Sequence, residues 1–330
     1  MTLDTVPLGR TGMEITRTGL GCWAIGGGGW AWGWGAQDDA VSVATIRHAV
    51  DLGVNWIDTA AEYGLGHAEE VVGRALRDIT EGARPYVFTK GGLVCDPADR
   101  RGPTRAVASA ASLRRECDAS LRRLGVERID LYQLHWPPDD GTEVEEYWGT
   151  LLDLRASGKV RAVGLSNFDV PGLEAAEGLG HVDTVQPPFS AIDRRAGADV
   201  IPWCGEHGTG VIVYSPMQSG LLTGEFSASR VASLPEDDWR RTSPDFTSGL
   251  PANLALSDAL QPVADRHGVT RAAVAVAWTL AFPSVTGAIV GARRPSQVDD
   301  WIPAASLELA GSDLAEIAAA IRATDAGRPV

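Results

Sequence analysis

Residues 54–64 read Val-Asn-Trp-Ile-Asp-Thr-Ala-Ala-Glu-Tyr-Gly, and the rest of the chain is organised around this stretch. A short apolar run ends in an acid, Asp58, and Tyr63 follows five positions later beside Gly64. The pattern predicts a buried strand that ends by passing two polar side chains to a loop. Barrel enzymes carry their catalytic groups at this end of their strands.

Strand-like and helix-like segments alternate along the whole chain. The number and order of the strands predict an α/β fold, a (β/α)8 TIM barrel. A doubly wound sheet is the competing interpretation, but Gly26 to Gly29 lead into tryptophans and not into a helix, which argues against a phosphate loop there. The predicted strands are 19–23, 54–58, 85–90, 129–135, 160–166, 183–187, 210–215 and 286–290.

Three further elements complete the predicted domain, which spans residues 1–330 without a linker. Residues 6–18, with a turn at 10–12, predict a β-hairpin that covers the N-terminal end of the barrel. The stretch 216–251 is rich in Ser, Thr, Asp, Pro and Gly, and we interpret it as a long loop at the active-site end. Residues 311–323 predict a C-terminal helix. Other predicted helices include 104–124, one opened by a capping box of Thr142 and Glu145, and one capped by Asp169.

The composition excludes several classes of function. The formal charge of −14 is unsuited to binding nucleic acid, which requires a basic face. Four dispersed cysteines, no signal-peptide pattern and no long apolar run predict a cytoplasmic protein with no membrane association. The six histidines form no metal-binding pair, so no metal site is expected. The oligomeric state stays open.

Polar residues end successive predicted strands: Asp58 with Tyr63, then Lys90, then His135. Each alone has an ordinary structural interpretation, as a helix cap, a packed phenol, a solvated amine or a structural imidazole. Together they suit carbonyl reduction, which needs a proton donor at the carbonyl oxygen. A tyrosine has a reference pKa of about 10, and a nearby lysine cation is expected to lower it. A carboxylate would hold the lysine, and a histidine would position the carbonyl.

These four residues, with their flanking sequences, resemble the catalytic tetrad of the aldo-keto reductase superfamily. Further motifs match in order: Gly164-Leu165-Ser166-Asn167-Phe168, Gln186-Pro187-Pro188-Phe189 and Tyr214-Ser215-Pro216, and the resemblance runs from Leu8 to Arg293. The stretch 21–28, Gly-Cys-Trp-Ala-Ile-Gly-Gly-Gly, looks most like the bacterial branch that contains the general stress and inositol-operon reductases.

The resemblance implies that NADP(H) lies extended over the barrel mouth, with NAD(H) possible, and that the tetrad is Asp58, Tyr63, Lys90 and His135. It also implies that Tyr214 stacks on the nicotinamide and that Arg293, a planar cation, holds a 2′-phosphate. The implied cofactor-binding residues are Gly21, Cys22, Trp23, Asp58, Ser166, Asn167, Gln186, Tyr214, Ser215, Pro216, Gln218, Gly220, Leu221, Gly224, Gly291, Arg293, Gln297 and Asp300.

Aromatic residues near the predicted mouth suggest a site for a small-molecule carbonyl substrate. Trp30, Trp32 and Trp34 are equally compatible with packing of a glycine-rich loop. The predicted substrate-binding residues are Trp23, Trp32, Tyr63, His135 and Trp136. The expected activity is NADPH-dependent reduction of an aldehyde or ketone. A sugar or polyol dehydrogenase, or a cofactor-sensing regulatory subunit of low turnover, remains an alternative.

Overall fold

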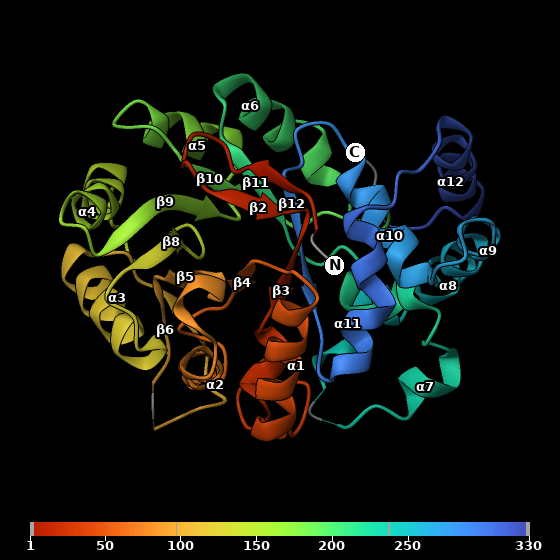
Figure 1. Ribbon diagram of the computed structural model, residues 1–330, viewed down its shortest axis with the longest axis horizontal. Coiled ribbons are helices and arrows are strands. Elements are labelled where there is room, and N and C mark those ends of the chain that lie inside the picture. Colours follow the sequence, from red (N-terminus) through yellow and green to blue (C-terminus); the bar gives the residue numbers. More distant parts are fainter. Residues whose placement is uncertain (1–2, 97, 237, 328–330) are drawn as a thin grey trace.

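The computed structural model of the chain describes residues 3–96, 98–236 and 238–327. Within these ranges, eight parallel strands close into a barrel in the order β10-β11-β12-β3-β4-β5-β8-β9, surrounded by helices (Figure 1). The predicted (β/α)8 barrel is confirmed, and each predicted strand is found. The barrel strands are β3 (Thr18–Gly21), β4 (Trp56–Asp58), β5 (Tyr86–Gly91), β8 (Ile129–Leu134), β9 (Val160–Ser166), β10 (Thr184–Gln186), β11 (Gly210–Val213) and β12 (Gly287–Gly291).

Helices connect the strands on the outside of the barrel, as parallel neighbours require. Their starts follow local chemistry: Asp169 accepts a hydrogen bond from the backbone N–H of Gly172 and caps its helix as predicted. The helices are α1 (Asp39–Asp51), α2 (His67–Arg77), α3 (Ala110–Leu124), α4 (Val144–Ala156), α5 (Val170–Glu177), α6 (Val200–His207), α7 (Ala228–Ala232), α8 (Leu250–Ala259), α9 (Gln261–His267), α10 (Arg271–Leu280), α11 (Pro295–Trp301) and α12 (Gly311–Thr324).

An antiparallel hairpin, β1 (Thr5–Pro7) and β2 (Glu14–Thr16), covers the N-terminal end of the barrel, as predicted. The side chains of Leu8, Met13 and Ile15 are fully buried and belong to one apolar cluster with Trp56 and other residues of the barrel strands. The indole N–H of Trp56, at the start of β4, donates to the carbonyl oxygen of Thr16. The hairpin therefore plugs the end of the barrel from which the strands begin.

The alternation of side chains along a strand separates this plug from the opposite end of the barrel. In β4, Trp56 belongs to the apolar interior cluster, and Asp58, two residues later on the same face, lies at the C-terminal end. In β5, Phe88 and Lys90 repeat this relation. The lower interior is thus apolar, and the polar side chains gather at the upper end, where barrel enzymes carry their active sites.

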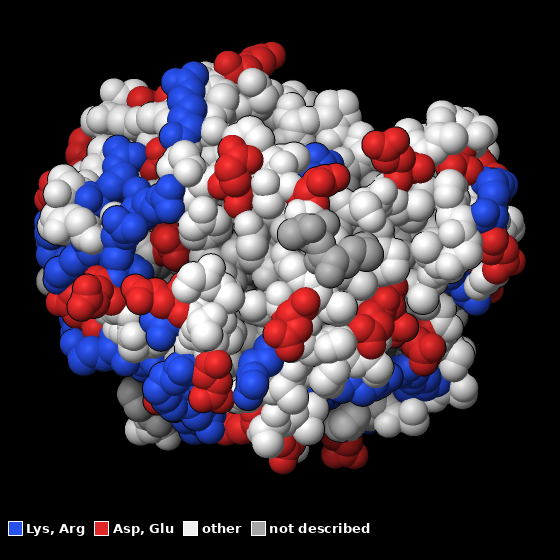
Figure 2. Space-filling view, in the orientation of Figure 1, with Lys and Arg blue, Asp and Glu red and all other residues white. Residues whose placement is uncertain are grey.

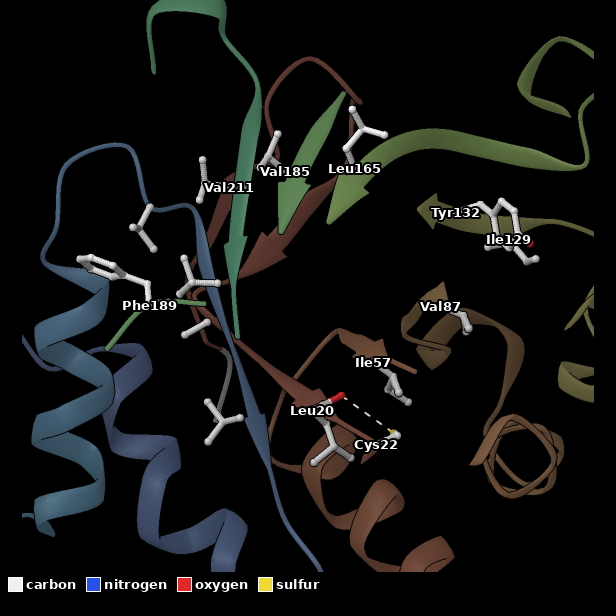
Figure 3. Packing of buried hydrophobic residues seen from close by; sticks show 14 of the residues in the cluster. Leu20, Cys22, Ile57, Val87, Ile129, Tyr132, Leu165, Val185, Phe189 and Val211 are labelled. Carbon is white, nitrogen blue, oxygen red and sulfur yellow. Dashed lines mark hydrogen bonds between the residues drawn. The ribbon is translucent and has the colours of Figure 1, made fainter. Parts of the chain in front are cut away.

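The outer faces of the strands pack against the helices. Leu165, Val185 and Val211 project from neighbouring strands in Figure 3 and belong to the largest apolar cluster, with residues of the surrounding helices. Burying such side chains contributes about 1.5–3 kcal/mol each. This layer holds the strand ends in register, and so it fixes the separation of the polar groups that they carry.

The connection between β11 and α10 is more structured than an irregular loop. It contains short helical turns η4 (Gln218–Thr223), η5 (Trp239–Arg241) and η6 (Pro244–Phe246), and the helices α7, α8 and α9. A separate apolar cluster, which includes Leu221, Phe246 and Ile317, ties it to α10 and α12. Figure 1 shows α7, α8, α9 and α12 together on one side of the barrel.

Two local predictions are wrong. The predicted helix 104–124 begins only at Ala110, because Arg105–Ala106 forms a strand, β7, that pairs with β6 (Leu93–Val94). The predicted capping box at Thr142 is absent, because α4 starts one residue later and its N-cap is Glu143, without a side-chain cap. Both errors concern helix starts, where a local pattern competes with tertiary contacts.

Lysine and arginine side chains concentrate on the left of the face seen in Figure 2, while acidic side chains are spread across it. No helix in the described ranges is both long and apolar enough to cross a membrane. Nor do the described histidine, cysteine and acidic residues form a cluster of three suited to a metal ion.

Candidate active site

The four predicted tetrad residues meet at the C-terminal end of the barrel. Lys90 Nζ, on β5, donates to Asp58 Oδ1 at 2.5 Å and to the backbone carbonyl of Thr59 at 3.0 Å. The same nitrogen lies 3.4 Å from the hydroxyl oxygen of Tyr63. His135 follows β8, and its ring meets the ring of Tyr63 edge-on with centroids 5.7 Å apart. Asp58 and Lys90 are 2% and 1% exposed, so this is a buried ion pair beside a phenol.

The pKa of Tyr63 is raised well above its ordinary value, by burial first and then by the charges of Asp58 and Glu62. The expectation that Lys90 lowers this pKa is therefore wrong for the protein alone. The lysine charge is directed mainly to the closer Asp58 carboxylate, which offsets it at the phenol. Tyr63 consequently holds its proton, which is the state that a general acid requires.

The ionisation of the other two groups also follows from burial. The pKa of His135 is lowered well below its ordinary value by burial and by the nearby Lys90 cation, so the imidazole is neutral. Burial raises the pKa of Asp58, while the Lys90 charge and hydrogen bonds from Lys90 and Gln186 oppose that shift. A neutral imidazole can donate one hydrogen bond from its protonated nitrogen.

A hydrogen-bonded network joins the residues implied to hold the nicotinamide. The hydroxyl of Ser166 donates to the carbonyl oxygen of Gln186 at 2.9 Å, and Tyr214 donates to Asn167 Oδ1 at 2.8 Å. The Asn167 amide donates to the carbonyl oxygen of His135 at 2.9 Å. Gln186 Nε2 donates to Asp58 Oδ2 at 3.0 Å. Ser166, Asn167 and Gln186, which the resemblance implies bind the nicotinamide carboxamide, therefore adjoin the tetrad.

The segment after β11 has an unusual backbone. Ser215, Gln218, Ser219 and Gly220 all have positive φ angles, of 57°, 44°, 54° and 97°. Non-glycine residues rarely adopt this conformation, and where they do the strain is often functional. Met217, with φ of −103°, precedes the left-handed Gln218, and such a pair can direct successive backbone N–H groups to one side, which suits an anion. The resemblance implies that this part of the chain binds the cofactor. Pro216 is buried within it, and Gly224 is exposed at its end, with φ of 83°.

Arg293 has a different set of partners from the one that the sequence suggests. Its guanidinium donates to the side chain of Gln37 at 2.8 Å, to the carbonyl oxygen of Trp34 at 3.1 Å and to that of Ala36. Gln297 accepts from the Arg293 backbone N–H at 2.8 Å. Arg293 thus fastens the loop after β3 to the start of α11. Gly291 and Asp300 flank these residues, and both are exposed.

Some residues implied to bind the cofactor have no accessible side chain. Cys22 is fully buried below Asp58, whose backbone oxygen accepts from the Cys22 N–H, and Figure 3 shows its sulfur beside Leu20 and Ile57. Leu221 is also fully buried, in the apolar cluster of the long connection. Gly21 lies inside β3 with Ile289 against it. These three positions can contact a ligand only through their backbone.

The tryptophans divide into two groups. Trp23 stacks on Tyr63 at 6.0 Å and, on its other side, on Trp239 of the long connection at 6.2 Å. Trp30 is buried, and its indole N–H donates to the Gly27 carbonyl, so it packs the glycine-rich loop. Trp34 packs against the guanidinium of Arg240. Trp32 and Trp136 are each 46% exposed. The tryptophans that line or support the mouth are therefore Trp23, Trp30, Trp34 and Trp239. Trp32 and Trp136 are open to solvent.

Comparison with known proteins decides the family. The sequence profile described as "Aldo/keto reductase family" matches residues 24–322. The chain belongs to the aldo/keto reductase family. It is an oxidoreductase of that family, whose members use a nicotinamide cofactor. The bacterial branch expected from residues 21–28 is confirmed by bacterial relatives with reductase names.

Two curated bacterial reductases match along most of their length. The aldo-keto reductase YhdN of Bacillus subtilis is 32% identical over 299 residues, covering 90% of this chain and 87% of that protein. The NADH-specific methylglyoxal reductase of Escherichia coli is 32% identical over 321 residues, covering 94% and 96%.

Two solved structures have the same fold as this chain. The glycerol dehydrogenase AKR11B4 of Gluconobacter oxydans is 35% identical, with a TM-score of 0.89 and coverage of 100% of this chain and 98% of that one. The aldo-keto reductase AKR11C1 of Bacillus halodurans, at 22% identity and a TM-score of 0.76, shares the fold over 96% of each chain.

The structure adds site residues that the sequence reasoning did not single out. Gln133, buried on β8, accepts from Gln186 Nε2 at 2.9 Å, and Glu62 lies beside His135. Arg240 and Trp239 come from the middle of the long connection. The alternation of side chains in β8, which puts Gln133 on the same face as His135, could have indicated the first. For the last two, no local pattern indicates that a distant loop returns to the mouth.

Proposed function

We propose that this aldo/keto reductase reduces a small aldehyde or ketone by hydride transfer, with Tyr63 as the general acid. The observation that carries the proposal is the half-buried Tyr63, whose hydroxyl lies 3.4 Å from Lys90 Nζ and beside the neutral ring of His135. The raised pKa of Tyr63 supports a protonated donor. Positioned proton transfer of this kind typically accelerates a reaction by about 10²–10⁴-fold.

The other tetrad residues have distinct roles in this proposal. Lys90 stabilises negative charge that develops on the tyrosine oxygen as its proton leaves, and Asp58 holds the lysine in place. His135 donates a hydrogen bond to the carbonyl oxygen and so orients the substrate. Trp23, stacked on Tyr63, forms one apolar wall, and the exposed Trp32 and Trp136 extend the surface available to the substrate.

Oxidation of an alcohol or polyol is the second candidate, because a relative of 35% identity is a glycerol dehydrogenase. In that direction Tyr63 would have to accept a proton as a phenolate. The raised pKa of Tyr63 disfavours the phenolate, so we expect oxidation to need a higher pH than reduction.

For the cofactor, we infer NADP(H) in preference to NAD(H), extended from the Gln186 region past Ser215 and Gln218 to the start of α11. Gln186 uses Nε2 in its hydrogen bonds, which leaves Oε1 to accept from a carboxamide. At the other end, Arg294 is exposed and its Nε donates to Ser296, whereas Arg293 is engaged by the loop. Arg294 is therefore the guanidinium more accessible to a 2′-phosphate. A relative with NADH in its name makes this preference a necessary test.

The remaining features of the proposal concern the protein as a whole. We infer a single barrel domain, with the connection 216–251 as part of its active-site end. The cysteines at positions 22, 95, 117 and 204 are free thiols, which supports a reducing, cytoplasmic location.

The test is a spectrophotometric assay of NADPH and NADH oxidation with a panel of small aldehydes, ketones and dicarbonyls, and of the reverse reaction with polyols. We expect reduction of several carbonyls, faster with NADPH at limiting cofactor. Tight cofactor binding without turnover of any carbonyl or alcohol would instead indicate a regulatory role.

A further inference from the structure

Glu62, the residue before Tyr63, has a carboxyl group directed at the ring of His135. Its Oε2 lies 4.0 Å from His135 Nδ1, and among the described residues no other carboxylate is within that distance of this ring. The residue is only 9% exposed. We propose that Glu62 is a positioning residue for His135: the two side chains hold one proton between them, and this proton keeps His135 Nε2 protonated as the donor to the substrate oxygen. The proposal deepens, and rests on, the proposed carbonyl reduction.

The position of the Glu62 carboxyl group is built by the β6–β7 hairpin. Thr104, directly before that hairpin's second strand, donates to Glu62 Oε1 at 2.9 Å, and the Thr104 hydroxyl lies 3.3 Å from the sulfur of Cys95. Glu62 Oε2 is left for His135. The main chain of His135 is held on both sides, because its backbone N–H donates to the carbonyl oxygen of Gly91 and its backbone carbonyl accepts from the Asn167 amide. The separation of 4.0 Å exceeds a hydrogen bond by about 1 Å, and such contacts in ligand-free active sites commonly shorten when substrate binds.

The number of protons on the pair determines whether His135 Nε2 carries a hydrogen. If the shared proton is on Glu62, the carboxylic acid donates to the lone pair of Nδ1, and the neutral ring must carry its hydrogen on Nε2. If the shared proton is on Nδ1, the ring is an imidazolium and Nε2 is again protonated. When the pair loses this proton, the carboxylate repels the lone pair at Nδ1. The remaining ring hydrogen then moves to Nδ1, and Nε2 no longer donates.

The surroundings favour retention of one shared proton. The charged group that acts on both members of the pair is Lys90 from β5. Glu62 in turn raises the pKa of its neighbour Tyr63 and that of Cys95, which follows β6. Burial raises the pKa of Glu62 and lowers that of His135, so it disfavours both the carboxylate and the imidazolium and favours the uncharged pair with the proton on Glu62. Titration of such a pair belongs to both residues together.

The test is the pH profile of kcat/KM for reduction of a carbonyl substrate from the panel. In the wild-type enzyme we expect a basic limb along which kcat/KM falls tenfold per pH unit. Glu62→Gln is expected to remove this limb, because the amide donates to Nδ1 at every pH. Thr104→Val is expected to shift the limb to higher pH, because the lost hydrogen bond stabilises the carboxylate. The exposed Glu81→Gln is the control and should keep the wild-type profile.

The outcomes separate this proposal from the proposed function. A limb that survives unchanged in Glu62→Gln, or a Thr104→Val profile identical to wild type, would overturn the role of Glu62 while leaving carbonyl reduction intact. Absence of carbonyl turnover in the wild-type enzyme at every pH would instead contradict the proposed function. Cofactor binding by each variant, followed by fluorescence, shows whether the fold is retained.

Discussion

Lys90 is almost completely buried, and its charge is balanced by Asp58 at 2.5 Å. Removing one partner of a buried ion pair leaves the other charge uncompensated, which usually costs about 3–5 kcal/mol. The cost arises because the remaining charge has lost its hydration and its partner. Lys90 therefore contributes both to the proposed catalysis and to the stability of the fold.

We expect Lys90→Met to reduce the free energy of unfolding by about 3–5 kcal/mol at neutral pH. Without the cation, the folded-state pKa of Asp58 rises further above its unfolded value. A group of this kind contributes stability below its unfolded pKa, and that contribution is lost as pH rises through the folded pKa. The variant should therefore gain stability relative to wild type as pH falls toward 4. Urea unfolding at several pH values measures this.

The double variant Asp58→Asn with Lys90→Met removes both charges and serves as the matched control. It should be less pH-dependent than Lys90→Met alone. A Lys90→Met protein that is as stable as wild type at neutral pH would show that Asp58 is not held ionised by the lysine.

The identity of the tetrad residues could be predicted from the sequence, because an acid, a tyrosine, a lysine and a histidine follow successive strands. The direction of their pKa shifts could not be predicted in the same way. The direction for Tyr63 depends on burial and on the relative distances from Lys90 to Asp58 and to Tyr63, which the spacing of residues does not contain. The contact of Glu62 with His135 likewise depends on the β6–β7 hairpin.

The loop after β3 is attached to the start of α11 by Arg293, which contacts the backbone at Trp34 and Ala36 and the side chain of Gln37. The neighbouring Arg294 is exposed at the N-cap of the same helix. Two adjacent arginines therefore have different roles, one in holding a loop and one at the proposed phosphate end of the cofactor.

We expect Arg294→Ala to raise the KM for NADPH about tenfold, since a charge-assisted hydrogen bond contributes about 1.5–3 kcal/mol, with little effect on the KM for NADH. Arg293→Ala should raise both values similarly, because it releases the loop. Steady-state kinetics with each cofactor measure this. An effect selective for NADPH in Arg293→Ala alone would assign the phosphate to Arg293, which would then have to leave the loop.

The elements themselves were largely predictable. Each barrel strand is a short apolar run bounded by turn residues, and the helix beginning after Asp169 has a capping side chain. The strands β6 and β7 have two residues each and form only through their mutual pairing, so no local pattern indicates them. The turns η4 and η6 in the connection 216–251 are held by apolar contacts with distant residues, and they were also not predicted.

The whole molecule separates a structural end from a chemical end of the barrel. Met13 and Leu8 of the hairpin fill the end from which the strands begin, while Lys90 and His135 lie at the end where the strands finish. The barrel architecture could be predicted from the number and order of the strands. Which distant segments return to the mouth, such as Trp239 and Arg240, depends on tertiary packing and was not predictable.

We expect Met13→Ala to destabilise the protein by about 2–5 kcal/mol, as large-to-small substitutions in a core usually do. The KM for substrate and cofactor should not change, because the cavity forms away from the active site. Thr5→Ala, at an exposed position of the same hairpin, is the control and should alter stability by at most about 0.5 kcal/mol. An altered KM in Met13→Ala would show that the two ends are coupled.

The central claim is that Tyr63 donates the proton to the carbonyl oxygen. The most direct measurement is the single-turnover rate of hydride transfer in Tyr63→Phe, with cofactor binding followed separately. The phenylalanine keeps the ring that packs on Trp23 and His135 and removes only the hydroxyl. We predict a rate lower by about a hundredfold or more, with cofactor affinity little changed. Hydride transfer at the wild-type rate in this variant would contradict the account.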